Sequence, residues 1–297
     1  MRRWRAAVIL AVAATFAGVV VAAACGASPT SPVPGTGAPA TVNPSAAAAP
    51  SESPSQAPTA VELTIFAAAS LRDAFAAVAE AYEAEHPGVT LTFSFDASSA
   101  LRAQIEQGAP ADVFASADTG NPQALASDGL TTGPPLPFAG SRLAIVVPAA
   151  NPAGITTPAD LARPGVRVVN AGAGVPITAY AAEMLGNLAG QPGYPPSFVA
   201  AVAANVVSRE DNVRAVLAKV QLGEGDAGIV YATDAAAAGD AVRTIPIPDP
   251  ANVVATYAAV VPTASPHSDA AEAFVAWLAG AEGRAVLARF GFTNPAS

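Results

Sequence analysis

The amino-acid sequence predicts an α/β fold of two lobes with a ligand cleft between them, and three observations carry this prediction. Strand and helix patterns alternate from Val61 to Ala115, and the alternation starts again at Arg142. A strand pattern then returns late, at residues 256–261, so the chain would cross between the lobes twice. Alternation of this kind builds mostly parallel sheets covered by helices, and small ligands bind preferentially between such lobes. Two crossings also favour a hinge.

The elements of the first lobe follow from hydrophobic spacing. Residues 61–66 alternate between apolar and polar side chains and are rich in β-formers, which predicts a strand. Apolar residues then recur at helical spacing from Leu71 to Tyr82, and Pro87-Gly88 ends that helix. The same reasoning predicts three further elements: a strand at 89–95, a helix at 99–107 and a strand at 111–115.

The second lobe shows the same two kinds of pattern. Its predicted elements are strands at 142–147, 166–170 and 227–231 and helices at 177–188 and 212–221. Two terminal helices, at 269–279 and 282–290, follow the late strand. We therefore assign residues 61–141 and 256–297 to lobe 1 and residues 142–255 to lobe 2.

Composition excludes several classes of partner and site. The formal net charge is −9 and no patch rich in Lys or Arg is present, so nucleic acid is not expected as a partner. An anionic ligand would have to be held by local dipoles. The single cysteine, Cys25, allows no intrachain disulfide and no cysteine-based zinc site. His86 and His267 are far apart in sequence and are interpreted as surface residues.

The N-terminal segment is typical of a secretory signal. Arg2 and Arg3 precede an apolar run that ends in small residues before Cys25. That ending resembles a bacterial lipobox, so residues 1–25 are predicted to be a lipoprotein signal peptide with Cys25 as the lipid anchor. Ordinary cleavage and a single transmembrane helix are the alternatives. Residues 26–60 are rich in Pro, Ser and Ala and are predicted to form a disordered linker.

Three predicted helices begin directly after a strand or a glycine-rich turn, a fourth opens after Asp211, and these four starts are the candidate anion sites. They lie at Ser70, at Ser98-Ser99, at Pro176-Ile177 and at Asn212-Val213. A helix start leaves backbone N–H groups unpaired beside the positive end of the helix dipole. Asp73, three residues after Ser70, completes a capping-box pattern there. Several starts converging on one cleft would hold a dianion without a salt bridge.

Longer motifs add a family resemblance. They are Phe66-Ala67-Ala68-Ala69-Ser70-Leu71, Gln107-Gly108-Ala109-Pro110-Ala111-Asp112, Glu210-Asp211-Asn212-Val213-Arg214, Gly228-Ile229-Val230-Tyr231 and Phe290-Gly291-Phe292. Together they resemble the periplasmic molybdate-binding proteins of ABC importers, from about residue 61 to residue 293. The resemblance implies the two-lobed periplasmic-binding-protein fold, with a hinge and an interlobe ligand cleft. It also implies an extracytoplasmic protein that captures molybdate or tungstate for an ABC permease, and the lipobox-like ending at Cys25 would anchor this protein to the cell membrane.

The resemblance also implies which residues hold the oxyanion. Ser70 and Ser98 would contribute hydroxyls and backbone amides, Ile177 and Val213 backbone amides, and Tyr231 its phenol. Ser99 replaces Ser98 if the register shifts by one. The metal would be bound only as the oxyanion, through these same five residues. We expect neither catalysis nor a cofactor, and we expect the protein to be a monomer. ATP hydrolysis would belong to another subunit, because the chain has no P-loop motif.

Three alternatives remain open at this point. The first is a receptor of the same fold for sulfate, phosphate or a small organic anion. Asp96 stands close to Ser98 and would accept the proton of hydrogen phosphate if it faced the site. We expect Asp96 to point into solvent instead. A secreted hydrolase is the second, but Ser70 lacks a G-x-S-x-G context and a placed histidine. An adhesion or structural domain is the third, and it would not explain the repeated helix starts.

Overall fold

The computed structural model describes residues 60–295 of the 297-residue chain. The predicted signal peptide, the lipid anchor Cys25 and nearly all of the linker therefore lie outside the described residues. No helix within residues 60–295 is long and apolar enough to cross a membrane.

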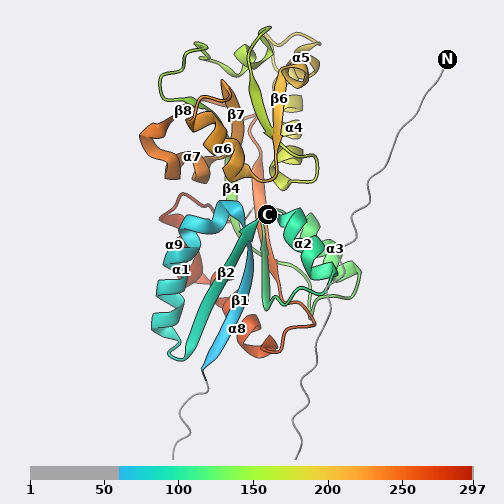
Figure 1. The fold of residues 1–297 in the computed structure, drawn as a ribbon, viewed down its shortest axis with the longest axis vertical. Coiled ribbons are helices and arrows are strands. Elements are labelled where there is room, and N and C mark those ends of the chain that lie inside the picture. Colours follow the sequence, from blue (N-terminus) through green and yellow to red (C-terminus); the bar gives the residue numbers. More distant parts are fainter. Residues whose placement is uncertain (1–59, 296–297) are drawn as a thin grey trace, which may run out of the picture. The chain divides into compact units, whose positions relative to one another are not determined.

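Two groups of strands, each covered by helices, form the two lobes seen in Figure 1. The strands in chain order are β1 (Val61–Ala68), β2 (Val89–Asp96), β3 (Val113–Ser116), β4 (Leu136–Pro148), β5 (Val168–Ala171), β6 (Val206–Glu210), β7 (Ala227–Tyr231), β8 (Val242–Ile245) and β9 (Val254–Val260). The α-helices are α1 (Arg72–Glu85), α2 (Ser98–Glu106), α3 (Gly120–Ser127), α4 (Pro176–Ala189), α5 (Phe198–Ala204), α6 (Val213–Gln221), α7 (Ala232–Ala238), α8 (Ser268–Ala279) and α9 (Ala281–Ala288).

Strand β4 connects the lobes because it changes partners along its length. Its first half, to Arg142, pairs with β9, whereas Leu143 and the residues after it pair with β7 and β8. The complete strand order is β2-β1-β3-β9-β4-β7-β5-β6, with β8 also on β4. The α/β two-lobed fold is thus confirmed, while the residue boundaries assigned to the lobes stay predictions.

The sheet departs from the mostly parallel arrangement expected from the alternation of elements. Pairs within each lobe, such as β1 with β2 and β5 with β6, are parallel. Every pair that involves β4 or β9 is antiparallel. The two strands run in opposite directions because one carries the chain out of lobe 1 and the other brings it back. Parallel pairing is consequently confined to the βαβ units of each lobe.

Parallel pairing also sets where the site is. In lobe 1 the chain leaves β1 at Ala68 and β2 at Asp96, which are register partners at the same end of the sheet. In lobe 2 the chain leaves β5 at Ala171 and β7 at Tyr231. Ligands of open α/β sheets bind beyond the carboxyl ends of their strands. In this fold those ends face the junction between the lobes (Figure 1).

Some sequence motifs serve the fold alone. Gly108 has φ of 88° and ends α2, and Asp112 follows in the same motif. One Asp112 carboxylate oxygen accepts the Thr64 N–H at 2.8 Å, and the other accepts the Ser265 hydroxyl at 2.5 Å. The buried Asp112 thereby joins β1 to the turn before α8, which gives this motif a structural role.

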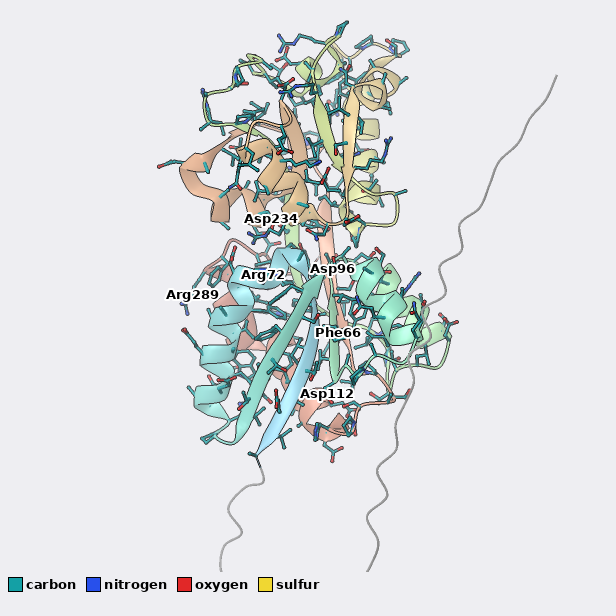
Figure 2. All side chains as sticks on the ribbon, viewed as in Figure 1. Phe66, Arg72, Asp96, Asp112, Asp234 and Arg289 are labelled. Atoms are coloured by element: carbon teal, nitrogen blue, oxygen red, sulfur yellow. The ribbon has the colours of Figure 1, made fainter. Side chains whose placement is uncertain are left out.

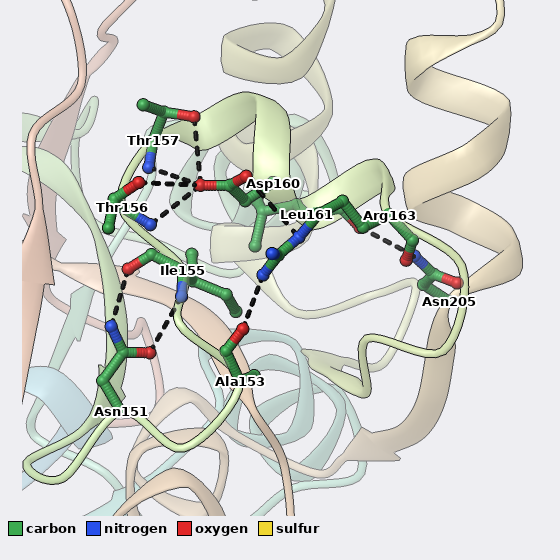
Figure 3. Close-up of polar contacts among 9 residues, drawn as sticks. All are labelled: Asn151, Ala153, Ile155, Thr156, Thr157, Asp160, Leu161, Arg163 and Asn205. Atoms are coloured by element: carbon green, nitrogen blue, oxygen red, sulfur yellow. Dashed lines mark hydrogen bonds and ion pairs between the residues drawn. The ribbon is translucent and has the colours of Figure 1, made fainter.

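The long connection between β4 and β5 contains one short 3-10 helix, Pro158–Ala162, and is otherwise fixed by side-chain hydrogen bonds to backbone (Figure 3). Asn151, at φ of 44°, donates to the Ile155 carbonyl and accepts the Ile155 N–H. Asp160 accepts the N–H groups of Thr156 and Thr157, and the Thr156 bond contributes most to lowering the pKa of its carboxyl group. These hydrogen bonds give the loop a defined conformation.

Candidate functional site

A small cavity lies between the lobes, where strand ends and helix starts of both lobes meet. Its lining includes Ser70, Asp96 and Ser98 from lobe 1 and Pro176, Asn212, Val213 and Tyr231 from lobe 2. The cavity volume is about 10 Å³, which is about the space of one water-sized sphere. A cavity of this size suits a small solute.

Ser70 is buried at the turn from β1 into α1, on a short 3-10 segment at Ala69–Leu71. Its hydroxyl lies 3.0 Å from the hydroxyl of Tyr257. It caps no backbone N–H, and Asp73 points to Arg214 instead, so the capping box expected here is wrong. The Ser70 hydroxyl turns into the junction because β9 places a phenol beside it.

Ser98 is the first residue of α2 and is also buried. Its oxygen accepts the N–H of Ala117, the residue after β3, at 3.0 Å. A hydroxyl whose oxygen already accepts a hydrogen bond keeps its own hydrogen for another partner. Ser99 is not among the residues that line the cavity. The geometry thus favours Ser98 over the adjacent register.

The two predicted amide donors lie at the starts of α4 and α6. Val213 lines the cavity as the first residue of α6, and the Asn212 side chain caps that helix by accepting the Ala215 N–H. Ile177 is the second residue of α4, after Pro176. Pro176 lines the cavity, whereas the buried side chain of Ile177 belongs to the core. The structure therefore brings Ser70, Ser98, Val213 and Tyr231 together and places Ile177 one residue behind the lining.

Tyr231 ends β7, and its hydroxyl group is the unusual one in this cavity. The side chain is 1% exposed, yet its oxygen has no hydrogen-bond partner within residues 60–295. An unpaired buried hydroxyl costs about 1–3 kcal/mol of stability. Burial raises the pKa of this phenol well above its usual value, so it stays protonated and can donate. Tyr231 lines the cavity, so its hydroxyl is available there as a hydrogen-bond donor.

Asp96 contradicts the expectation that it points into solvent. It lines the cavity at the end of β2, at the junction of the lobes (Figure 2). One carboxylate oxygen accepts the Ala97 N–H at 2.7 Å and the Asn212 side-chain amide at 3.4 Å. The parallel register of β2 and β1 sets this orientation, because it places Asp96 level with Ala68. Asp96 thus forms a contact between the lobes that sequence spacing alone did not reveal.

A second interlobe contact lies beside Ser70, around Arg214 of α6. Its guanidinium bridges Asp73 of lobe 1 at 2.5 Å and Asp234 of lobe 2 at 2.7 Å. Asp234 is completely buried at the junction (Figure 2), and burial raises the pKa of its carboxyl group to about 6 although Arg214 opposes the shift. Asp73 and Arg214 also border a larger cavity of about 430 Å³, which Ser70 lines as well.

Tyr257 of β9 is the functional candidate that the sequence analysis missed. Its ring is buried next to Tyr231, with ring centroids 5.5 Å apart. Its strand pattern is that of any buried strand, so nothing local marked it. Within residues 60–295 no group of three or more His, Cys, Asp or Glu side chains is arranged to hold a metal ion.

Comparisons with known proteins agree with this geometry. The family model described as "Bacterial extracellular solute-binding protein" matches residues 63–293. The molybdate-binding protein ModA of Mycobacterium tuberculosis is 39% identical over 250 residues, covering 82% of this chain and 91% of that protein.

Two solved structures have the same architecture. The substrate-binding domain of a putative molybdenum ABC transporter from Clostridium difficile is 30% identical, has a TM-score of 0.59 and covers 80% of this chain and 100% of that one. The sulfate-binding protein SubI of Mycobacterium tuberculosis is 25% identical and has a TM-score of 0.67. The match covers 79% of this chain and 87% of that one.

Proposed function

The chain belongs to the family of bacterial extracellular solute-binding proteins, and on this premise we propose that it captures molybdate or tungstate between its lobes for an ABC importer. The relative at 39% identity is named as a molybdate-binding protein, and it is matched over 91% of its length. The observation that carries the proposal is the Tyr231 hydroxyl, which has no hydrogen-bond partner within residues 60–295 and borders the same small cavity as Ser70 and Ser98.

The donors proposed for the anion are neutral and come from both lobes. Lobe 1 offers the hydroxyls and backbone amides of Ser70 and Ser98, and lobe 2 offers the amides of Ile177 and Val213 and the Tyr231 phenol. About seven hydrogen bonds to a charged group, at roughly 1.5–3 kcal/mol each, sum to on the order of 10–20 kcal/mol before ordering costs. Nanomolar affinity needs about 12 kcal/mol. A dianion can therefore be held although the formal net charge of the chain is −9.

The proposed cycle uses the two strands that cross between the lobes. The open form would bind the anion, and closure would bring the donors of lobe 2 onto it. Closure around a ligand by a hinge is a known motion of periplasmic binding proteins. The closed protein, acting as a monomer without catalysis or a cofactor, would then dock on its permease and release the ion. ATP hydrolysis would take place in another subunit.

Calorimetric titration at neutral pH with molybdate, tungstate, sulfate and phosphate tests the proposal. We expect molybdate and tungstate to bind with similar affinity, because they are alike in charge and size. Sulfate is smaller, so a site closed around the larger ions cannot bring every donor within about 2.7–3.2 Å of its oxygens. Sulfate or phosphate binding as tightly as molybdate would contradict the assignment.

Hydrogen phosphate is the second candidate ligand, because Asp96 lines the cavity. A carboxylate can accept the proton that phosphate keeps near neutral pH. One oxygen of Asp96 already accepts from Ala97 and Asn212, and an anion beside a carboxylate is repelled unless it brings that proton. Phosphate binding that is lost in Asp96→Asn would identify a phosphate receptor. Molybdate binding that is retained or improved in the same variant supports the first proposal.

We also propose that Cys25 anchors the protein to the extracytoplasmic face of the cell membrane through a lipid. The apolar run before it and the Pro- and Ser-rich segment after it support this. Expression of the wild type and of Cys25→Ser in a bacterial host, followed by fractionation, provides the test. The wild type should partition with membranes and the variant should not. Equal partitioning of both into the soluble fraction would refute the anchor.

A further inference from the structure

Tyr257 is held rigidly at the junction of the lobes. Its ring is completely buried on β9 and contacts three aromatic rings. The ring centroids lie 5.3 Å from Phe292, 5.5 Å from Tyr231 and 6.1 Å from Phe138. Phe292 belongs to the Phe290-Gly291-Phe292 motif, so that motif packs directly against Tyr257. A ring enclosed in this way presents its hydroxyl in one direction only.

That direction is toward Ser70. The two oxygens lie 3.0 Å apart, and within residues 60–295 neither hydroxyl has another hydrogen-bond partner. Only one of the two can donate. If Ser70 donated to Tyr257, its oxygen would face the cavity with lone pairs alone and would repel an anion. If Tyr257 donates, the Ser70 hydrogen is free for the ligand. Burial raises the pKa of Tyr257 well above its usual value, so this phenol keeps the proton that it must donate.

We propose that Tyr257 is a positioning residue for the ligand: it donates its phenolic hydrogen to the Ser70 oxygen and thereby holds Ser70 as a hydrogen-bond donor to the bound oxyanion. This inference rests on the proposed function and extends it to a residue outside the predicted donor set. Tyr257 itself does not line the cavity, so it acts through Ser70.

Ser98 provides an internal comparison for this role. Its oxygen accepts the N–H of Ala117, which can only donate, so the direction of that hydrogen bond is certain. Both serines of lobe 1 would then be oriented in the same way, one by a backbone amide and one by a phenol. Because a phenol can be changed by mutation, the Ser70 arrangement is open to a direct test.

The test is a pair of double-mutant cycles read out as molybdate affinity by calorimetry. Tyr257→Phe should weaken binding about tenfold, which corresponds to about 1.4 kcal/mol. In the Ser70→Ala background the same change should alter affinity less than twofold, because the hydroxyl through which Tyr257 acts is gone. In the Ser98→Ala background it should again cost about tenfold. Tyr82→Phe, a buried tyrosine of α1 remote from the cavity, serves as the matched control and should keep wild-type affinity.

Each outcome decides the inference. Wild-type affinity in Tyr257→Phe overturns it and leaves the proposed function intact. Equal losses in the Ser70→Ala and Ser98→Ala backgrounds also overturn it, since they show a general structural effect. A wild-type protein that binds none of the oxyanions overturns the proposed function and this inference with it.

A second measurement covers the case in which Tyr257→Phe does not fold. Fluorotyrosine placed at position 257 keeps the hydroxyl, and its fluorine resonance should shift when molybdate saturates the protein. An unchanged resonance at saturation would overturn the inference.

Discussion

The two walls of the cavity differ in how their buried polar groups are satisfied. On the lobe 1 wall the hydroxyls of Ser70 and Ser98 already have partners, in Tyr257 and the Ala117 N–H. On the lobe 2 wall the Tyr231 hydroxyl has none within the described residues. Nearby in lobe 2, the buried carboxylate of Asp234 relies on the guanidinium of Arg214.

This difference separates the roles of the lobes. The lobe 1 donors are oriented by the protein itself, so this wall is ready before a ligand arrives. On the lobe 2 wall the Tyr231 hydroxyl lacks a hydrogen-bond partner within the described residues, and a ligand can supply one. We therefore expect lobe 1 to capture the ligand first, and the contacts of lobe 2 to supply the free energy of closure. Preorganised groups lower the ordering cost of binding, whereas unsatisfied ones lower the stability of the empty protein.

The largest expected effect concerns the buried charge near the lobe 2 wall. The pKa of Asp234 is about 6 in the folded protein, above its ordinary 3.8, so between these values the folded state binds more protons than the unfolded state. Its contribution to stability is complete below about pH 4 and is lost as the pH rises through 6. Urea denaturation should show the wild type losing up to about 3 kcal/mol relative to Asp234→Asn over this range.

Asp226 gives that experiment a control of opposite sign. Burial raises the pKa of Asp226, but its hydrogen bonds and ion pair with Arg167 outweigh burial and lower it overall. Its stabilisation is present above the unfolded pKa and is lost as the pH falls. Relative to Asp226→Asn, the wild type should therefore gain stability with rising pH. If the difference in free energy of unfolding between the wild type and Asp234→Asn does not change with pH, ionisation of Asp234 does not destabilise the folded protein.

The next effect distinguishes the walls most directly. Tyr231→Phe removes an unpaired hydroxyl, so the empty protein should become more stable by about 1 kcal/mol. The same variant should lose molybdate affinity by about a hundredfold, because the hydrogen bond to the ligand is fully formed on binding. Thermal denaturation and calorimetry measure the two quantities. Tyr194→Phe, in the same lobe, is the control and should change neither stability nor affinity. If Tyr231→Phe is less stable than the wild type, the proposed difference between the two walls is wrong.

The smallest effect concerns the lobe 1 wall. Ser98→Ala should weaken binding about tenfold or more and should also destabilise the empty protein by about 1–3 kcal/mol, because the buried Ala117 N–H loses its acceptor. Stability and affinity thus fall together here, whereas they change in opposite directions at Tyr231. Ser99→Ala is the matched control. A larger affinity loss at Ser99 than at Ser98 would indicate the shifted register.

The elements with clear hydrophobic periodicity could be predicted from sequence. Helices α1 and α6 and strands β1 and β7 lie within a few residues of their expected ranges. Alanine-rich helices such as α7 were missed because alanine gives no contrast between a buried and an exposed face. Strand β6 was missed because it pairs only with β5, at the edge of the sheet, and is incompletely buried.

The placement of residues at the cavity was predictable where a residue is tied to a local motif. Ser70, Ser98 and Val213 each stand at a helix start, and that position is visible in the sequence. The orientation of Asp96 and the contact of Tyr257 with Ser70 depend on pairing between strands distant in sequence. The expected capping box failed for the same reason: tertiary partners for Ser70 and Asp73 outweighed a local hydrogen bond.

Strand β9 has a consequence for the order in which the protein assembles. It lies between β3 and β4 in the sheet, yet it is the last strand to be synthesised. Strands β4 to β8 are contiguous in the chain, so lobe 2 can pair its strands while β3 still has an open edge. Lobe 1 begins first and is completed last, because residues 254–260 must insert into the middle of its sheet. Until then the chain exposes two unpaired strand edges, which are sites of aggregation. The strand that carries the chain back between the lobes is thus also the last strand to join the sheet.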